Sequence, residues 1–460
     1  MLEGLELNEM LLSEVVDADI SFRCESEFFK KKILLAKALI ENCPTVSLLN
    51  EVAPDIQHPV EITRAYAETG YRMLLAQEVR SNQLVLGEGS YLDNPNAQFV
   101  KRNKLDVGDV VLTRTGANFG QCAPVLFDDE LFACADLLIV RKGVIPAEYL
   151  STFLNTWQGR LLLDRGAYGA AQPHIAPAYL KNLPIPIFSN LIEPISKLIE
   201  KSAATRKKGV ELLKDAEKHL LSTLSLDSWT PPTPLSYVRS SSDAFSSGRL
   251  DSQYFAPRVR ELMRRLGQNG LCIGDVAPAR HERFKPNDSG MFDYIEIGGL
   301  GSDGTATAES LEQKEAPSRA TQFVRTGDVI TSTVRPIRRL SALIAEQQDG
   351  NVCSSGFVVL NPQKISSEVL LTYLRMPLFC ELMDLHTSAT MYPAISETDL
   401  LSLPIPAIDA KTQLAIQKSV REAAASRQRA NNLLAAAKRA LEIAIEDSEA
   451  AALAYLKGAI

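Results

Sequence analysis

The sequence predicts an α+β protein made of two tandem domains of mixed α/β structure with twisted sheets, separated by two long antiparallel coiled-coil helices in a pseudo-twofold symmetric arrangement. Three observations predict this fold. The chain repeats itself once, each copy carries several β-rich runs, and each copy ends in a long stretch with heptad-spaced apolar residues.

The repeat is visible in motifs that return in the same order. The matched pairs of segments are 20–29 with 246–255, 105–116 with 324–335, 144–156 with 364–376, and 169–186 with 388–406. The members of each pair lie about 220 residues apart, far more than a solenoid repeat of roughly 20–50 residues. The sequence therefore predicts two copies of one domain.

The copies and their connections divide the chain into five parts. We expect a first domain at 1–188, a first long helix at 189–225, a linker at 226–248, a second domain at 249–408, and a second long helix with the C-terminal tail at 409–460. The linker is rich in proline and serine, which is typical of connections between folded parts.

Both domains are expected to contain the same elements in the same order. Helices are predicted at 28–42, about 254–267, 146–157 and 366–376, and strands at 109–115, 135–142, 328–334 and 356–362. Gly108-Asp109 and Gly327-Asp328 precede two of these strands. We interpret both pairs as tight turns, since glycine tolerates a positive φ and aspartate binds the turn backbone.

The phrase Leu-Pro-Ile-Pro closes each domain, at 183–186 and 403–406. Two prolines one residue apart forbid a helix and hold the backbone extended. We therefore expect a stiff connecting segment between each domain and the long helix that follows it.

The two long stretches each carry a seam of apolar residues. The first has Ile192, Ile195, Ile199, Leu213, Ala216 and Leu220, interrupted by Ser202, Arg206 and Gly209; the second has Ile416, Val420, Ala423, Ala430, Leu434, Ala437, Leu441 and Ala444. Heptad spacing predicts a coiled coil, and alanine permits a close approach of the two helices. Such a pair would be a spacer of roughly 50 Å. The alternative is two amphipathic helices, each lying on its own domain.

The composition is that of a soluble globular protein, with a net charge of −7. No apolar run reaches the roughly 18 residues of a membrane span, so we expect no membrane partner. The seven cysteines and five histidines are scattered, which argues against a zinc site and favours reduced thiols in the cytoplasm. The net charge does not by itself indicate nucleic-acid binding.

In the order of its elements the chain resembles the specificity subunit of type I restriction–modification systems. The residues that carry the resemblance are "GDVVLTRTG" and "GDVITST" within the domains, the "LPIP" exits, and an acidic or amide residue in the first turn of each long helix, Glu193 and Gln413. The family commonly has a Pro-x-x-Glu-Gln motif at the start of each helix. Here the corresponding stretches are "NLIEPI" and "DAKTQLAI", so the docking of a catalytic partner is less well defined.

The resemblance implies two target-recognition domains that read a bipartite sequence of double-stranded DNA, one half-site each. It also implies that the long helices dock two methyltransferase subunits, that restriction subunits join for cleavage, and that the complex defends against phage. No cofactor is expected in this chain; the partner methyltransferase would use S-adenosylmethionine, and the restriction subunit ATP and Mg²⁺.

Polar loops near the Gly-Asp strands supply the candidate DNA contacts. Base edges are usually read by Arg, Asn, Gln and Ser/Thr, and phosphates are held by basic clusters. The candidates are Lys101, Arg102, Lys104, Arg114, Thr115, Asn118, Gln121, Gln172 and His174 in the first domain, and Arg335, Arg338, Arg339 and Tyr392 in the second. Solvated surface charge is the alternative for each basic residue.

The sequence lacks the motifs of a DNA-modifying enzyme. A methyltransferase would need a glycine-rich cofactor loop and an Asn/Asp-Pro-Pro-aromatic tetrad, and "LDNPNAQF" and "VLNPQK" lack the second proline and the aromatic residue. No P-loop is present, and "EQK" at 312–314 lies in a polar loop, so we expect a non-catalytic chain. A protein-interaction adaptor that binds no DNA, or a target-recognition subunit of another DNA-modification system, remains the alternative.

Overall fold

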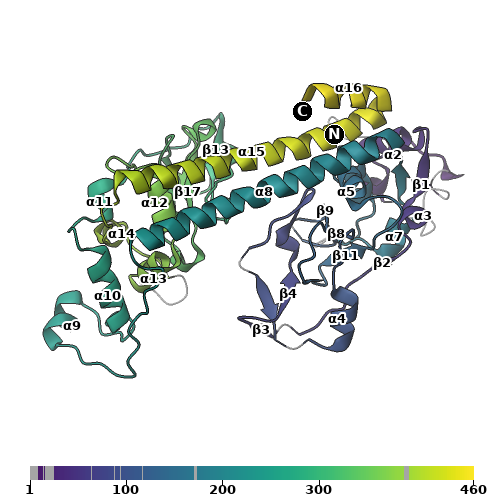
Figure 1. Cartoon of the computed structure of the whole chain (residues 1–460). Coiled ribbons are helices and arrows are strands. Elements are labelled where there is room, and N and C mark those ends of the chain that lie inside the picture. The colour runs from purple at the N-terminus through teal and green to yellow at the C-terminus, as the bar shows by residue number, and fades with distance from the viewer. Residues whose placement is uncertain are drawn as a thin grey trace. The chain divides into compact units, whose positions relative to one another are not determined.

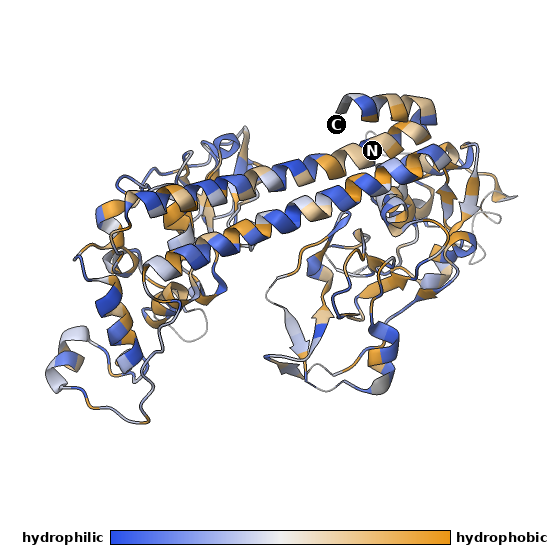
Figure 2. Ribbon diagram, in the orientation of Figure 1, coloured by the Kyte–Doolittle hydropathy of each residue, from blue (hydrophilic) through white to orange (hydrophobic). Residues whose placement is uncertain are grey.

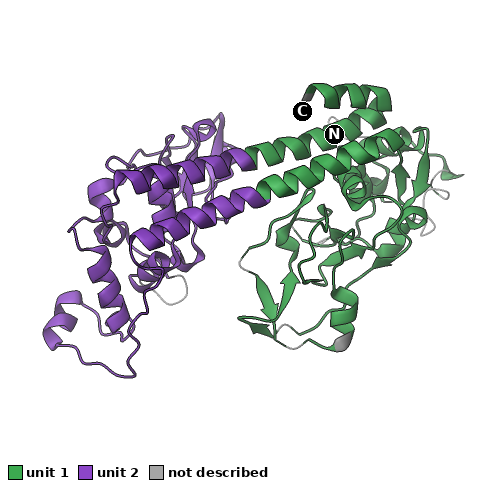
Figure 3. Cartoon of the chain, viewed as in Figure 1, with its two compact units in different colours: residues 1–206, 427–460 green, residues 207–426 purple. Residues whose placement is uncertain are grey.

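The structure is a computed structural model, and it describes residues 9–13, 15, 25–63, 65–87, 89–93, 95–116, 118–169, 173–387 and 393–459. The chain forms two compact units (Figure 3): unit 1 comprises residues 1–206 and 427–460, and unit 2 comprises residues 207–426. The division falls within the two long helices, α8 (Ser189–Thr223) and α15 (Ala410–Glu446), so each helix contributes a segment to both units.

Unit 1 mixes short helices and short strands (Figure 1). Its helical elements are η1 (Ser26–Phe29), α2 (Lys31–Glu41), α3 (Leu49–Val52), η2 (Ala76–Glu78), α4 (Ala97–Asn103), α5 (Ala147–Asn155), α6 (Trp157–Arg165), α7 (Pro177–Lys181) and α16 (Glu449–Ala459). Its strands are β1 (Val46–Leu48), β2 (Ile56–Gln57), β3 (Tyr66–Ala67), β4 (Tyr71–Leu74), β5 (Val79–Arg80), β6 (Gln83–Leu84), β7 (Ser90–Leu92), β8 (Val110–Thr113), β9 (Cys122–Pro124), β10 (Leu131–Ala133), β11 (Leu137–Val140) and β12 (Pro184–Pro186).

Unit 2 is built in the same way. Its helical elements are α9 (Ser241–Ser247), α10 (Pro257–Leu266), α11 (Ile273–Val276), η3 (Ile297–Gly299), η4 (Gln313–Glu315), η5 (Pro336–Arg338), η6 (Glu346–Gln348), α12 (Ser367–Leu374), α13 (Pro377–Leu385) and α14 (Glu397–Ser402). Its strands are β13 (Met291–Ile295), β14 (Glu309–Glu312), β15 (Ala320–Phe323), β16 (Val329–Ser332), β17 (Ser341–Leu343), β18 (Val352–Ser354) and β19 (Phe357–Leu360).

The strand pairing confirms the duplication. In unit 1, β8 pairs antiparallel with both β9 and β11, and β4 pairs parallel with β10. In unit 2, β16 pairs antiparallel with both β17 and β19, and β13 pairs parallel with β18. Strands β8, β11, β16 and β19 fall where the β-rich runs predicted them, and every one of their residues is buried.

The Leu-Pro-Ile-Pro segments are extended, as predicted, and buried tyrosines hold them. In unit 1, β12 pairs with β1, and the Tyr149 hydroxyl donates to the Pro186 carbonyl at 2.9 Å while accepting from the Phe188 N–H at 3.1 Å. In unit 2, the Tyr373 hydroxyl donates to the Pro404 carbonyl at 2.6 Å. Both hydroxyls come from the helix that follows the central sheet, so each segment is fixed to its domain before the long helix begins.

The segments of α8 and α15 pack antiparallel within each unit, along the apolar positions that recur on both helices (Figure 2). In unit 1, Leu433, Ala437 and Leu441 of α15 join the core that contains β8 and β11. In unit 2, Ala216 and Leu220 of α8 join the core that contains β16 and β19. Each long helix thus packs against the sheet region of both copies, which rules out the arrangement with each helix on its own domain alone.

Two of the residues expected to interrupt the seam lie inside it. Ser202 is buried, and its hydroxyl donates to the Ala430 carbonyl at 2.9 Å. A Cβ at Gly209 would lie 3.3 Å from the Ala423 carbonyl oxygen, so the helices approach too closely there for a larger side chain. The centre of the helix pair therefore requires small side chains at these two positions, and not necessarily apolar ones.

Candidate nucleic-acid interface

The Gly-Asp turns position the strands from which the candidate loops emerge. In unit 1, Gly108 has φ 97°, and the buried Asp109 carboxylate accepts from the Asp106 N–H at 3.0 Å and the Lys142 N–H at 3.1 Å. The Arg141 Nη1 atom donates to the same carboxylate at 2.7 Å. The turn therefore depends on a buried charge that is both hydrogen-bonded and paired.

Unit 2 repeats this turn with the arginine on a different segment of the chain. Gly327 has φ 86°, and the Asp328 carboxylate accepts from the Arg325 N–H at 2.9 Å. The cation is Arg280, whose hydrogen bonds to Asp328 raise the pKa of its guanidinium. The aspartates thus anchor the frame in both copies, and the copies differ in the loops beyond the strands.

In unit 1 the loop after β8 folds back as a tight turn. The Thr113 hydroxyl accepts from the Gln121 N–H at 2.8 Å and donates to the Asn118 carbonyl. Thr115 is only 5% exposed and its hydroxyl lies 3.5 Å from the Asp136 carboxylate, so it faces the protein. Arg114, Asn118 and Gln121 keep half-buried side chains at this turn.

The first basic cluster lies at the C-terminal end of α4. The side chains of Lys101, Arg102 and Lys104 are exposed, and no acidic side chain of the described residues pairs with them. The backbone carbonyls of Arg102 and Lys104 accept from Arg141 at 3.0 and 2.8 Å. Two of these cations also complement the negative end of the helix dipole, so a structural role accounts for part of this cluster.

The second basic cluster is divided between two roles. Arg339 is half-buried: its Nε donates to the Arg375 carbonyl at 2.6 Å and its Nη2 pairs with Glu217 of α8. The backbone N–H of Arg335 donates to the Pro393 carbonyl at 2.9 Å. Arg338 is exposed and, among the described residues, its guanidinium has no ion-pair partner. Arg338 is therefore the cation of this cluster that is available to a ligand.

Of the remaining candidates, Gln172 and Tyr392 lie outside the described residues. His174 is half-buried and exchanges two backbone hydrogen bonds with Tyr168, at 2.8 and 2.9 Å, and its ring lies 6.1 Å from the Tyr168 ring. Its Nδ1 is buried with no hydrogen-bond partner in the described part of the chain. His174 thus sits in a structured two-strand contact.

The helix positions expected to form the seam or to bind partners are placed as follows. Ile195, Ile199, Leu220, Ile416, Val420, Ala423, Ala430, Ala437 and Leu441 are buried, and Ile192, Leu213 and Leu434 are half-buried. The buried residues are therefore occupied by the intramolecular helix pair. The large apolar side chains that the long helices leave exposed are Val210 and Leu414, at 44% and 65%.

Unit 2 also carries a basic segment that is not among the candidates predicted from the sequence. His281, Arg283 and Lys285 are exposed and alternate along an extended segment that pairs with β15 through Arg283 and Gln322. Successive side chains of a strand point to opposite faces, so these three share a face. The alternation of basic residues in "RHERFK" was the pattern that could have revealed it.

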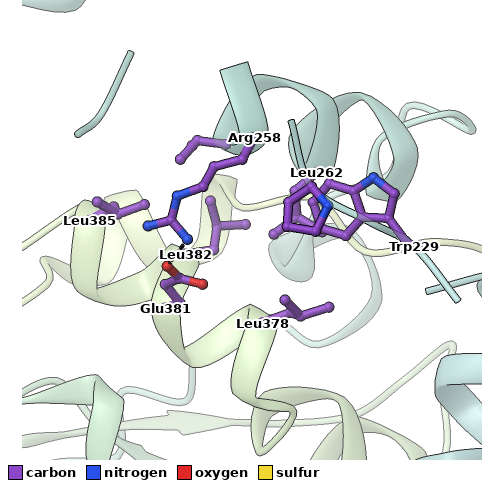
Figure 4. A pocket seen from close by; sticks show the side chains of 9 residues that line it. Trp229, Arg258, Leu262, Leu378, Glu381, Leu382 and Leu385 are labelled. Carbon is purple, nitrogen blue, oxygen red and sulfur yellow. Dashed lines mark ion pairs between the residues drawn. The ribbon is translucent and has the colours of Figure 1, made fainter. Parts of the chain in front are cut away.

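A hollow of about 100 Å³ lies in unit 2 between the linker, α10 and α13 (Figure 4). Leu378, Leu382 and Leu385 face Trp229 across it, and Arg258 pairs with Glu381 at its side. Its lining is mostly apolar and holds no candidate nucleophile.

The described residues offer no group of three or more metal-binding side chains, and no described helix meets the length and hydropathy of a membrane span. Burial raises the pKa of the Cys122 and Cys353 thiols to about 12. Both thiols are protonated at neutral pH, so neither is a nucleophile in this fold.

No protein-family model matches the chain, and no curated protein matches it. Among solved structures the chain is similar to a chain from a study of complex assembly and conformational transition of the type I R-M system, at 18% identity over 91% of this chain and 98% of that chain, with a TM-score of 0.26.

Two further solved structures are similar over most of their length. The S subunit of a type I restriction-modification system from M. genitalium is 13% identical over 91% of this chain and 96% of that chain, with a TM-score of 0.34. The HsdS subunit from Thermoanaerobacter tengcongensis is 17% identical over 90% and 96%, with a TM-score of 0.25. These chains come from the class of system that the sequence resembles.

Proposed function

We propose that the chain is a specificity subunit that reads a bipartite DNA sequence for a type I restriction–modification complex, one half-site per domain. The observation that carries the proposal is the duplicated frame with unlike loops. The β8–β11 and β16–β19 pairs and their Gly-Asp turns repeat, whereas the loops that follow β8 and β16 differ in side chains and anchoring. Two readers of two different half-sites require this combination.

The antiparallel segments of α8 and α15 support a spacer role. Two half-sites on duplex DNA must be read at a fixed separation, because half-site spacing mirrors the geometry of the protein. A helix of 35 residues rises roughly 50 Å. In this proposal, the pair of helices α8 and α15 sets the spacing between the two half-sites.

The exposed apolar residues of the long helices support a docking role for partners. Val210 and Leu414 lie on helices whose other large apolar residues are mostly buried. We propose that two methyltransferase subunits bind along these helices and that restriction subunits join them. Catalysis, and the S-adenosylmethionine, ATP and Mg²⁺ that it needs, would belong to those partners, and the complex would act in the cytoplasm.

The net charge of −7 favours a second candidate, an adaptor that binds proteins and not DNA. The two are separated by salt: DNA binding by the chain with its partners weakens steeply between 50 and 200 mM salt, on the order of 10³-fold for several phosphate contacts. Adaptor complexes held by apolar contacts do not show this dependence.

The direct test is base-modification sequencing of host DNA with the gene present, deleted and restored. The proposal expects that deletion removes modification from one split motif, two short blocks around a fixed gap, and that restoration returns it. If every modified motif survives deletion, the chain does not direct a methyltransferase.

A further inference from the structure

The loop Arg335–Arg339, here called the arginine loop, has an unusual backbone. Arg335 and Arg339 both have positive φ, 51° and 58°, and they flank a single 3₁₀ turn, Pro336–Arg338. Positive φ is sterically unfavourable for residues other than glycine, and it persists where the surrounding structure imposes it. The described residues contain two other non-glycine residues of this kind, Asn82 and Ser225, and neither shares a loop with a second one.

Contacts on both sides of the arginine loop impose this conformation. At its start, the Arg335 N–H donates to the Pro393 carbonyl at 2.9 Å, and Pro336 is buried. At its end, Arg339 and Arg375 grip each other's backbone: Arg339 Nε donates to the Arg375 carbonyl at 2.6 Å, and Arg375 Nη1 donates to the Arg339 carbonyl at 2.7 Å. The Arg339 guanidinium also forms an ion pair with Glu217 of α8.

Fixing the loop this way displays two side chains at its tip. Ile337 is 53% exposed although it is apolar and β-branched. Arg338 beside it is exposed, and no carboxylate in the described part of the chain pairs with it. An apolar group next to a free guanidinium on a rigid loop suits a surface that offers apolar groups, hydrogen-bond acceptors and negative charge together.

The major groove of DNA is such a surface, since guanine presents the acceptors O6 and N7 and thymine presents a methyl group. We propose, on the basis of the function proposed above, that the arginine loop enters a groove of the second half-site. Arg338 binds a guanine edge and Ile337 contacts a thymine methyl on a neighbouring base pair. Arg339 is a positioning residue that holds the loop and does not touch DNA.

The loop that occupies the corresponding place in unit 1 is unlike it. Among its described residues, the glycines Gly116 and Gly120 have positive φ, and Arg160 of α6 holds the loop by a 2.8 Å hydrogen bond to the Phe119 carbonyl. None of these described residues forms a counterpart of the exposed Ile337–Arg338 pair. The arginine loop therefore contributes to the half-site read by the second domain and not to the other.

The test is selection from a randomised duplex library by the full chain assembled with its methyltransferase partners, comparing wild type with Ile337→Ala, Arg338→Ala and Arg338→Lys. Both positions are exposed, so the fold tolerates the changes. Met291→Ala and Arg264→Ala, at exposed positions of the same unit, are matched controls. Arg338→Ala is expected to lose about tenfold preference at one G·C position, Arg338→Lys to recover little of it, and Ile337→Ala to lose preference for T at a position next to it.

Several outcomes overturn the proposal. These are an unchanged motif in all three variants, a change in the first half-site, or an equal loss of affinity for all sequences, which is the behaviour of a phosphate contact. Arg339→Ala should also weaken the base preferences within the second half-site. The motif selected by the Arg264→Ala control should match that of wild type. If wild type itself selects no split motif, the proposed function fails; if it does and the variants match it, only this inference fails.

Discussion

The guanidinium of Arg280 binds both carboxylate oxygens of Asp328, with Nε 2.7 Å from Oδ2 and Nη2 2.9 Å from Oδ1. The matching Asp109 is bound instead by Arg141, which is also 3.1 Å from Gln57. The strand pairing shows which positions correspond in the two copies. Ala279 bridges Leu360 in unit 2, as Ile56 pairs with Val140 in unit 1. Arg280 therefore corresponds to Gln57, and Asn361 corresponds to Arg141. The two copies therefore keep one ion pair, but its cation lies on two different segments of the chain.

This exchange predicts a rescue. Arg280→Gln leaves the buried Asp328 without its cation and should lower the free energy of unfolding of unit 2 by about 3 kcal/mol. Adding Asn361→Arg recreates the arrangement of the first copy and should restore about half of the lost free energy of unfolding. Hydrogen exchange of peptides that cover β16 and β19 measures both changes.

Arg283→Gln is the control, since Arg283 is an exposed arginine on the same segment. If the double variant exchanges as fast as Arg280→Gln alone, the two ion pairs are not equivalent.

The tyrosines that hold the Leu-Pro-Ile-Pro segments should differ in importance. Tyr149→Phe removes two hydrogen bonds and leaves the Pro186 carbonyl and the Phe188 N–H buried without their partner, which should cost roughly 2 kcal/mol. Tyr373→Phe removes one and should cost about 1 kcal/mol. Thermal denaturation measures the difference, with the exposed Tyr66→Phe as the silent control. Equal effects of the first two variants would contradict this account.

The centre of the helix pair should reject large side chains. Gly209→Leu places atoms against the Ala423 backbone, and Ser202→Leu both overfills the seam and removes the 2.9 Å hydrogen bond to Ala430. Each should destabilise the chain by about 2 kcal/mol or more. The same substitution at exposed Ala204, on the outer side of α8, should be nearly neutral. Chemical denaturation of the three variants decides; equal midpoints would mean that the helices do not approach closely.

Thiol reactivity should follow burial. The pKa of Cys122 and Cys353 is raised to about 12 and that of Cys43 to about 11, so at pH 8 all three are protonated and unreactive in the folded chain. In the unfolded chain their pKa falls to the ordinary value near 9. The free energy of unfolding should therefore fall as the pH rises above about 9, because only the thiols of the unfolded chain ionise there.

Iodoacetamide labelling at pH 8, followed by mass spectrometry with and without urea, tests this. Cys122 and Cys353 should be labelled only in urea. Labelling of either one in buffer at the rate of a free thiol would show that the strands β9 and β18 open readily.

The repeat explains why the fold could be predicted from the sequence. Each element was indicated twice, so the helices at 146–157 and 366–376 were located to within a few residues of α5 and α12. Helices α6 and α13, which follow them directly, were not predicted, because Trp157 and Pro377 begin new helices after breaks too short to mark as loops.

The candidate site was predicted less completely. Adjacency in the sequence places Arg339 in one cluster with Arg338, yet its partner Glu217 lies 122 residues away, a contact that no local pattern reveals. The heptad pattern predicts that Ser202 interrupts the apolar seam, because that pattern reflects the hydropathy of residues and not their size. Local sequence patterns predict the helices and strands, whereas the roles of individual polar residues depend on long-range contacts.

Replacing residues 249–408 with a second copy of residues 23–188, and then mapping the modified motif in the host genome, shows whether each domain reads one half-site. The long helices are unchanged in this variant, so the modified motif should contain the first half-site twice, in inverted orientation, across an unchanged gap. A motif that retains the second half-site would contradict this prediction.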